Sequence, residues 1–306
     1  MSNTNRPITH YLRERFMPHI WCAGCGHGTV LNQLVRSVDE LGLKKREIVM
    51  VSGIGCSARM AGYLDFHTLH TLHGRALAFA TGVKMSRPEL TILCPLGDGD
   101  ALAIGGNHFI HAARRNIDIT VMVLNNRIYG MTGGQFSPQS GCGIEASTAP
   151  FTTIDEAFDT VKLATAAGAS FVARATAYHV QELQQILTKA IRHRGFSVVE
   201  VLSQCPTHFG RRNGNLEAIE MLQGFKDGTA RIGSKQLEKN PDLIPRGIFV
   251  EESRDEYCDR YLEIIRRAGS AGQPEEDALA TDEAVDSEMT DTDAIAVETG
   301  TTGGDA

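Results

Sequence analysis

A carboxylate and an amide side chain follow two neighbouring segments of the sequence that have the pattern of strands. Asp98 stands between Gly97 and Gly99 directly after one apolar run, and Asn126 follows the next run 28 positions later. One strand–helix–strand step takes about 30 residues, so both side chains are expected at one edge of a parallel sheet. Such oxygen ligands suit Mg²⁺ completed by a backbone carbonyl and phosphate oxygens, and the glycines would let a diphosphate approach the backbone. Taken alone, either residue would instead be a turn cap.

The seven cysteines offer a second kind of chemistry. An odd count with no export signal argues against a disulfide framework. Cys22 and Cys25 form a C-x₂-C turn, and thiolates at that spacing bind Zn²⁺ or an iron–sulfur cluster, or act as a dithiol redox pair. No apolar strand precedes this turn, as a thioredoxin site would need, and no second C-x₂-C completes a zinc ribbon. Cys94 is expected to be a buried apolar side chain, whereas Cys142 and Cys258 have no partner at ligand spacing.

Alternating helix-like and strand-like segments must position these groups. Apolar residues at helical spacing predict helices over 28–41, 75–85, 102–115, 155–167, 179–193 and about 252–267. Short apolar runs predict strands over 47–52, 90–96, 118–124, 170–175 and 196–202. Strands joined by helices imply an α/β fold, with a mostly parallel sheet covered by helices on both faces. Ligands bind outside the carboxyl ends of such strands, so the unusual residues that follow the strands are expected to share one crevice.

Charge is unevenly distributed along the 306 residues. Residues 269–306 contain eleven acidic side chains and no Lys or Arg, which predicts a disordered acidic tail. The rest of the chain carries 30 basic and 26 acidic side chains, so it suits an acidic protein partner. We expect no nucleic-acid binding, since no basic cluster is interleaved with aromatic residues. No apolar run approaches the ~20 residues of a membrane span, and the N-terminus has no export signal, so a cytoplasmic protein without membrane contact is expected.

The segment from Gly97 to Asn126 resembles the signature of enzymes that depend on thiamine diphosphate (ThDP). The resemblance implies a ThDP-binding fold in which Asp98 and Asn126 bind Mg²⁺ through their side chains and Ile128 through its carbonyl. The stretch 129–135, which reads Tyr-Gly-Met-Thr-Gly-Gly-Gln, is similar to the loop that surrounds the thiazolium and diphosphate in 2-oxoacid:ferredoxin oxidoreductases. The resemblance covers roughly residues 10–210.

The cysteines match the same family. Cys22, Cys25, Cys56 and Cys205 follow its four-cysteine pattern in order and context: a C-x₂-C near the N-terminus, one cysteine after the first strand and one just before a proline. The resemblance therefore implies a [4Fe–4S] cluster beside the diphosphate. It also implies cofactor contacts after the strands, at Gly55, Cys56, Ser57, His73, Gly97, Gly99, Asp100, Tyr129, Gly130, Met131 and Thr132.

The substrate is indicated less directly. The stretch 16–22 looks more like that of 2-oxoglutarate enzymes than of pyruvate enzymes. Arg59 is a candidate for binding the second substrate carboxylate, because a guanidinium binds carboxylates bidentately. The alternative is that Arg59 binds phosphate or caps a helix.

The family resemblance implies a β subunit with three parts. Residues 1–210 would bind ThDP, Mg²⁺ and the cluster, 211–268 would form an arm and helix that pack on the partner, and 269–306 would be the acidic tail. The activating glutamate would belong to a separate α subunit, so no catalytic residue is assigned to this chain. The expected assembly is an αβ unit that pairs to (αβ)₂.

The implied reaction is the coenzyme A-dependent, reversible oxidative decarboxylation of 2-oxoglutarate to succinyl-CoA and CO₂, with electrons passed through the cluster to ferredoxin. Three alternatives remain open at this point. In the first, the substrate is pyruvate or another 2-oxoacid. In the second, the chain is a cluster-bearing electron-transfer subunit without catalysis of its own. The third is a zinc-stabilised or dithiol redox protein.

Overall fold

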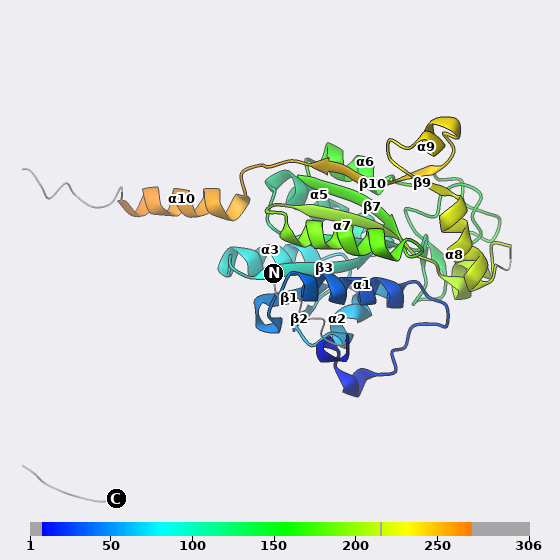
Figure 1. The fold of residues 1–306 in the computed structure, drawn as a ribbon, viewed down its shortest axis with the longest axis horizontal. Coiled ribbons are helices and arrows are strands. Elements are labelled where there is room, and N and C mark those ends of the chain that lie inside the picture. Colours follow the sequence, from blue (N-terminus) through cyan, green and yellow to red (C-terminus); the bar gives the residue numbers. More distant parts are fainter. Residues whose placement is uncertain (1–7, 215, 271–306) are drawn as a thin grey trace, which may run out of the picture. The chain divides into compact units, whose positions relative to one another are not determined.

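The computed structural model describes residues 8–214 and 216–270. Eight strands form one sheet in the order β2-β1-β3-β4-β8-β7-β10-β9 (Figure 1), and only β10 and β7 pair antiparallel. The strands are β1 Ile48–Ser52, β2 His67–His70, β3 Thr91–Gly97, β4 Thr120–Asn125, β7 Phe171–Thr176, β8 Ser197–Leu202, β9 Thr229–Arg231 and β10 Ile244–Glu251. A separate hairpin pairs β5 Ile128–Tyr129 with β6 Gln135–Phe136. The predicted α/β class with a mostly parallel sheet is confirmed.

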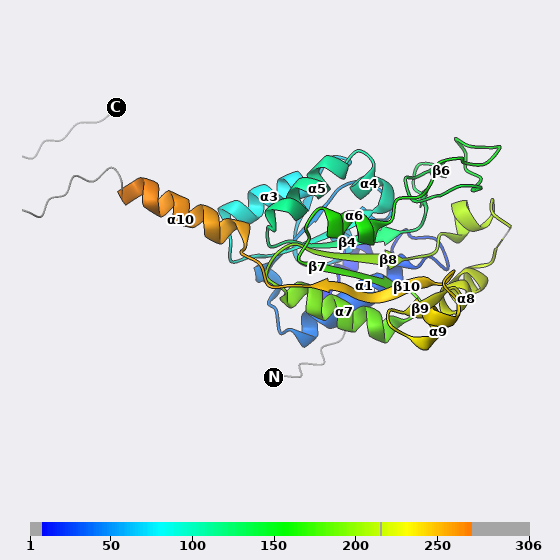
Figure 2. The ribbon, with the colours of Figure 1, turned by 90° about the horizontal axis from the view of Figure 1, so that it is seen from above.

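Helices cover both faces of the sheet (Figure 2). One face carries α1 His27–Glu40 and α7 Val180–Arg192, and the other carries α3 Ala76–Ser86, α5 Gly106–Arg115 and α6 Thr160–Ala166. In β1, Val49 and Val51 belong to the core under α3, whereas Met50 belongs to the core under α1 and α7. Successive strand side chains point to opposite faces, so a strand buried on both faces must be apolar throughout.

The remaining elements are short or lie near the chain ends. The helices are α2 Met60–Tyr63, α4 Asp98–Leu102, α8 Ala218–Asp227, α9 Lys235–Lys239 and α10 Tyr257–Ser270. The short 3₁₀ helices are η1 Ile8–Tyr11, η2 Glu14–Phe16, η3 Lys45–Glu47 and η4 Ser57–Arg59. The segment η5 Pro206–Gly210 is a turn of the wider π-helix. Within the described ranges, no helix has the length and apolar character that crossing a membrane requires. Residues 271–306, most of the expected acidic tail, lie outside the described residues.

Three predicted helices differ from those observed. The helix expected over about 252–267 begins only at Tyr257. The helix expected over 102–115 begins only at Gly106, as α5, and Leu102 instead ends the separate helix α4. The helix expected over 155–167 begins only at Thr160, because the Asp159 carboxylate caps it by accepting hydrogen bonds from the N–H groups of Val161 and Lys162. The arm predicted over 211–268 contains β9 and β10, and β10 joins the main sheet beside β7. Helix capping and long-range strand pairing therefore decided these boundaries.

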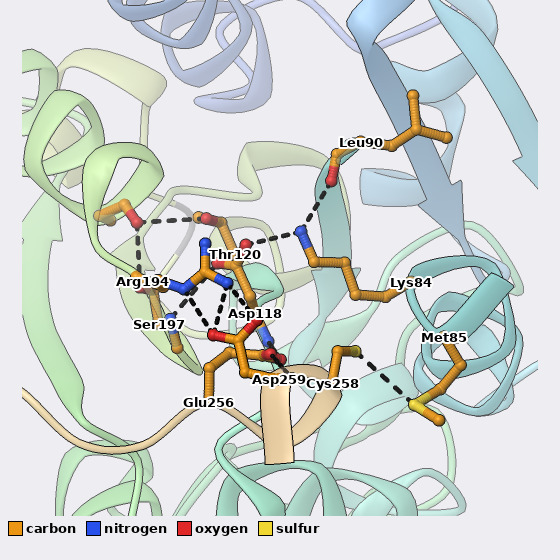
Figure 3. A network of polar contacts seen from close by, with 12 residues as sticks. Lys84, Met85, Leu90, Asp118, Thr120, Arg194, Ser197, Glu256, Cys258 and Asp259 are labelled. Carbon is orange, nitrogen blue, oxygen red and sulfur yellow. Dashed lines mark hydrogen bonds and ion pairs between the residues drawn. The ribbon is translucent and has the colours of Figure 1, made fainter. Parts of the chain in front are cut away.

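A buried polar network holds the residues before α10 against the start of β4 (Figure 3). Glu256 Oε1 accepts a hydrogen bond from the Asp118 N–H at 3.0 Å, and its Oε2 accepts one from the Asp259 N–H at 3.0 Å. Lys84 Nζ lies 2.6 Å from Asp118 Oδ2. This network lies at the amino ends of the central strands, opposite the edge where the predicted site residues follow the strands.

The strand order places a topological switch point between β1 and β3. From β1 the chain moves outward to β2, and it then crosses to the other side of β1 to form β3 and β4. Connections on either side of such a point diverge, which leaves a crevice at the carboxyl ends of the two strands. The residues that follow β1, β3 and β4 are therefore the first place to look for a ligand site.

Candidate functional site

A cavity of about 520 Å³ opens at this switch point. Its walls come from residues 54–57 after β1, 97–100 at the end of β3 and 126–135 after β4, joined by His73 and His27. The volume is in the range of small-molecule and cofactor sites. All eleven residues predicted to contact the cofactor line this cavity, together with Asp98, Asn126 and Ile128. The structure thus gathers the predicted cofactor and magnesium residues at one site.

Asp98 is the first residue of α4 and is 3% exposed. Its Oδ2 accepts a hydrogen bond from Ser137 Oγ at 2.6 Å, and the N–H groups of Gly99 and Arg127 also donate to the carboxylate. Burial nevertheless raises the pKa of Asp98 to about 6. A buried carboxylate that its own donors do not fully stabilise gains from a nearby cation, so Asp98 fits the role of a magnesium ligand.

Asn126 and Ile128 bring two further oxygen atoms to the cavity wall. Asn126 Oδ1 accepts a hydrogen bond from the Ile128 N–H at 3.2 Å, which closes a tight turn directly after β4. Arg127, between them, has a φ of 62°, in the left-handed region that residues other than glycine seldom adopt. Carboxylate, amide and carbonyl oxygens are the hard ligands that Mg²⁺ prefers, so the three residues fit this ion.

Asp100 holds His73 at the opposite wall. Asp100 Oδ1 lies 2.6 Å from His73 Nδ1 and accepts a hydrogen bond from the Gly74 N–H at 2.7 Å. A Cβ atom at Gly53 would lie 2.1 Å from Asp100 Oδ2, so the close approach of this carboxylate to β1 requires glycine there. Because Nδ1 is engaged by Asp100, Nε2 is the ring nitrogen of His73 that is left for a ligand in the cavity.

The four cysteines of the predicted cluster lie close together beside the cavity. Cys22 and Cys25 form the turn before α1, Cys56 follows β1, and Cys205 follows β8. A Cβ atom at Gly130 would lie 3.5 Å from Cys205 Sγ and 3.7 Å from Cys56 Sγ. Cys22 is exposed, whereas Cys205 is buried. Residues separated by about 180 positions in the chain are thus neighbours in space.

The environment of these sulfurs suits metal-bound thiolates. Burial, with a smaller effect from the other three thiols, raises the pKa of Cys25 to about 12, so its thiolate form needs a positive partner such as a metal centre. Backbone N–H groups donate hydrogen bonds to three of the sulfurs: His27 to Cys25, Met131 to Cys56, and Phe209 among others to Cys205. Such hydrogen bonds are one of the means by which proteins tune iron–sulfur clusters.

These thiols do not form a site for a single ion. Among residues 8–214 and 216–270, no three His, Cys, Asp or Glu side chains are arranged so that they could hold one metal ion.

Sequence reasoning missed His27, which lines both the cavity and the cysteine group. His27 is fully buried, and its Nδ1 lies 3.0 Å from Ser203 Oγ. Burial lowers its pKa to about 4, so the ring is neutral at physiological pH. Its position two residues after Cys25, at the start of a helix, was the available signal. Ile54 and Gln135 also line the cavity without having been predicted to contact the cofactor.

Arg59 is not among the residues that line the cavity. It ends η4, and its guanidinium carbon lies 5.9 Å from the centre of the Tyr63 ring. Its Nε is buried and has no hydrogen-bond partner among the described residues. Of the three cysteines left out of the predicted cluster, Cys94 and Cys258 are buried and Cys142 is exposed.

Residues 53–201 match the family model described as thiamine pyrophosphate enzyme, C-terminal TPP binding domain. This span contains the cavity residues that follow β1, β3 and β4. The fold, the cavity and this match together define a thiamine diphosphate-binding α/β protein.

Comparison with known proteins shows to which family within this class the chain belongs. The chain is 47% identical over 267 residues to the 2-oxoglutarate synthase subunit KorB of Archaeoglobus fulgidus (87% of this chain, 97% of the relative) and 46% identical over 269 residues to that of Methanothermobacter thermautotrophicus (87% and 94%). The solved structure of the 2-oxoglutarate:ferredoxin oxidoreductase from Magnetococcus marinus, with 2-oxoglutarate, coenzyme A and succinyl-CoA bound, matches with a TM-score of 0.79 and 32% identity, over 90% of this chain and 94% of that chain. The chain belongs to the β subunits of the 2-oxoacid:ferredoxin oxidoreductases.

Proposed function

We propose that this chain is the β subunit of a 2-oxoglutarate:ferredoxin oxidoreductase. With an α subunit it would convert 2-oxoglutarate and coenzyme A reversibly to succinyl-CoA and CO₂, and pass the electrons through a [4Fe–4S] cluster to ferredoxin. The main support for this proposal is that Cys56 takes part in two sites. It lines the cofactor cavity and also belongs to the group of four cysteines, so carbon chemistry and electron removal would take place side by side.

The cavity residues would hold the cofactor through its diphosphate. Asp98, Asn126 and the Ile128 carbonyl would bind Mg²⁺, and Gly97 and Gly99 line the same cavity. Tyr129 limits the cavity on this side, since a Cβ atom at Gly99 would lie 2.2 Å from its ring. Bound ThDP supplies the carbanion chemistry that a 2-oxoacid decarboxylation requires. This chain would therefore bind and orient the cofactor.

Cys22, Cys25, Cys56 and Cys205 would hold the cluster. Clusters with cysteine ligands reach the low potentials of ferredoxins, and hydrogen bonds to the sulfurs raise or lower that potential. Because Cys22 is exposed while Cys205 is buried, electrons would leave the protein on the side of the Cys22–Cys25 turn. A single cluster suits removal of electrons one at a time.

The partner subunit would complete the site. No Glu lines the cavity in the described part of the chain, which supports an activating glutamate on an α subunit. Several large apolar side chains at or beside the cavity are exposed, as a surface covered by a partner would be: Ile54 at 40%, Leu72 at 68%, Ile104 at 52% and Met131 at 44%. The arm and helix proposed for 211–268 would add to this contact.

We therefore expect no turnover by the purified chain alone. The assay contains 2-oxoglutarate, coenzyme A and a dye acceptor, with and without the α subunit, under anaerobic conditions. Activity is expected only in the mixture, because the cofactor is held but not activated by the β subunit. Turnover by the isolated chain would refute the proposal that the α subunit is needed for catalysis. A mixture that oxidises pyruvate in preference to 2-oxoglutarate would refute the proposed substrate.

Arg59 remains our candidate for binding the second substrate carboxylate. Replacing Arg59 by Met is expected to raise the KM for 2-oxoglutarate about 10- to 100-fold, the equivalent of the roughly 1.5–3 kcal/mol of a hydrogen bond to a charged group. The KM for pyruvate, which has no second carboxylate, should change little. The Arg59→Lys variant is the matched control, since it keeps the positive charge. Equal effects on both substrates would mean that Arg59 has a structural role beside Tyr63.

A further inference from the structure

We propose that Glu200 is a positioning residue for the magnesium and diphosphate site. This inference rests on the proposed function, because it concerns the residues assigned there to Mg²⁺. Glu200 lies in β8 between Val199 and Val201, and it is 1% exposed. A charged side chain in the middle of a strand buried on both faces is unusual and needs partners.

Both carboxylate oxygens of Glu200 are fully engaged. Oε1 accepts hydrogen bonds from Asn125 Nδ2 at 2.9 Å, Gln139 Nε2 at 2.8 Å and Thr160 Oγ1 at 3.0 Å. Oε2 accepts one from Arg174 Nε at 2.5 Å. These four partners come from the end of β4, the loop after β6, the start of α6, and β7. One carboxylate thus fixes four segments that are far apart in the sequence.

The first connection runs through the end of β4. Asn125 donates to Glu200 from its side-chain nitrogen, and its Oδ1 accepts a hydrogen bond from the Arg127 N–H at 3.2 Å. The residue between them is Asn126, the proposed magnesium ligand. Glu200 therefore sets the side-chain orientation of Asn125, and through it the turn that presents Asn126 and Ile128 to the cavity.

The second connection runs through the loop after β6. Gln139, held by Glu200, lies between two serines that contact the site. Ser137 Oγ donates to Asp98 Oδ2 at 2.6 Å, and Ser140 Oγ donates to the Arg127 carbonyl at 2.6 Å. Glu200 thus fixes the loop that orients the carboxylate of Asp98, so both sets of contacts lead to proposed magnesium ligands.

Arg174 forms an ion pair with Glu200 and so offsets the cost of burying its charge. Its Nη2 lies 2.7 Å from Asp159 Oδ1, so one guanidinium bridges Asp159 and Glu200. A buried ion pair often contributes little net stability compared with apolar residues of the same size. Stability alone is therefore a weak reason for a Glu–Arg pair inside this sheet. A more specific reason is to hold the turn that bears Asn126 and the loop that contacts Asp98 in place, in the way that outer partners orient metal ligands.

The test measures how ThDP binding to the αβ complex depends on the Mg²⁺ concentration, by calorimetry and without turnover. Glu200→Gln keeps the shape but loses the charge. Gln139→Met removes the hydrogen bonds that Gln139 donates to Glu200, to Thr160 and to the Phe158 carbonyl, and it leaves the Glu200–Arg174 pair intact. We expect the Mg²⁺ concentration at half-maximal ThDP binding to rise about 10- to 100-fold in the first variant and about 10-fold in the second. Saturating Mg²⁺ should restore ThDP binding in both.

The matched control is Asp118→Asn at the other end of the strands (Figure 3). It removes the charge of a second ion pair, in which Lys84 Nζ lies 2.6 Å from Asp118 Oδ2. Its Tm should fall without any change in the Mg²⁺ dependence. Unchanged Mg²⁺ dependence in both Glu200→Gln and Gln139→Met, with a lowered Tm, would reduce Glu200 to a stabilising residue. If Glu200→Gln does not fold, the Mg²⁺ dependence of ThDP binding by Gln139→Met tests the proposal. A wild-type complex that binds no ThDP at any Mg²⁺ concentration would overturn the proposed function itself.

Discussion

Replacing Asp98 by Ala is expected to abolish ThDP binding by the αβ complex. Loss of an outer partner of a metal ligand typically weakens metal binding about 10- to 100-fold, so loss of a ligand itself should exceed about 100-fold. The measurement is calorimetry of ThDP with Mg²⁺, together with the ThDP content of the purified complex. Activity should disappear in parallel, because this chain supplies the diphosphate half of the site.

Two comparisons make this result specific. Asp98→Asn keeps one oxygen at the cavity wall and should bind ThDP more weakly than the wild type but better than Asp98→Ala. Asp118→Asn, at the opposite edge of the sheet, should bind ThDP normally. Undiminished ThDP in the Asp98→Ala complex would exclude Asp98 as a ligand. A wild-type complex that contains iron and sulfide but no ThDP would favour the alternative of an electron-transfer subunit without catalysis.

Purification without oxygen is expected to yield about four iron atoms and matching acid-labile sulfide per chain, with no stoichiometric zinc. Replacing Cys25 by Ser should reduce the iron and sulfide to a small fraction of these values and bleach the visible spectrum. The reason is that Cys25 lies near the other three thiols of the group, and a serine hydroxyl is a poorer ligand for cluster iron than a thiolate. The experiment needs only metal analysis and an absorption spectrum.

The other cysteines provide the controls. Cys142→Ser should leave iron and sulfide unchanged, since Cys142 is an exposed loop residue apart from the group. Cys22→Ser and Cys56→Ser should both lose iron, but only Cys56→Ser should also weaken ThDP binding, because only Cys56 lines the cavity. Stoichiometric zinc without sulfide would contradict the four-iron assignment and support a zinc-stabilised protein.

Local patterns predicted most of the elements that carry the site. The apolar runs at 90–96 and 118–124 correspond to β3 and β4, and the residues that follow them do line the cavity. Prediction from the sequence failed where a long-range or capping contact determines whether an element forms or where it begins. The short strand β2 carries the exposed His67 and His70 and is held by pairing with β1, which its own residues do not reveal.

The contact between His73 and its carboxylate partner could not be predicted from the sequence either. His73 comes from the connection after β2, and Asp100 lies 27 positions further on, yet their side chains are 2.6 Å apart. Spacing along the sequence identified both as cofactor contacts but did not pair them. The crossing from β2 to β3 at the switch point brings them together.

The sequence by itself determined which residue types follow each strand, because secondary-structure periodicity and short motifs are local properties of the chain. Only the tertiary structure decided that His27 borders both the cavity and the cysteines, and that Arg59 stands outside the cavity lining. It also decided that Glu200 joins the turn that bears Asn126 to the loop that contacts Asp98. Glu200 has no motif around it, and its partners lie between 26 and 75 positions away. Such contacts arise from the packing of strands and loops against one another, and no local pattern records that packing.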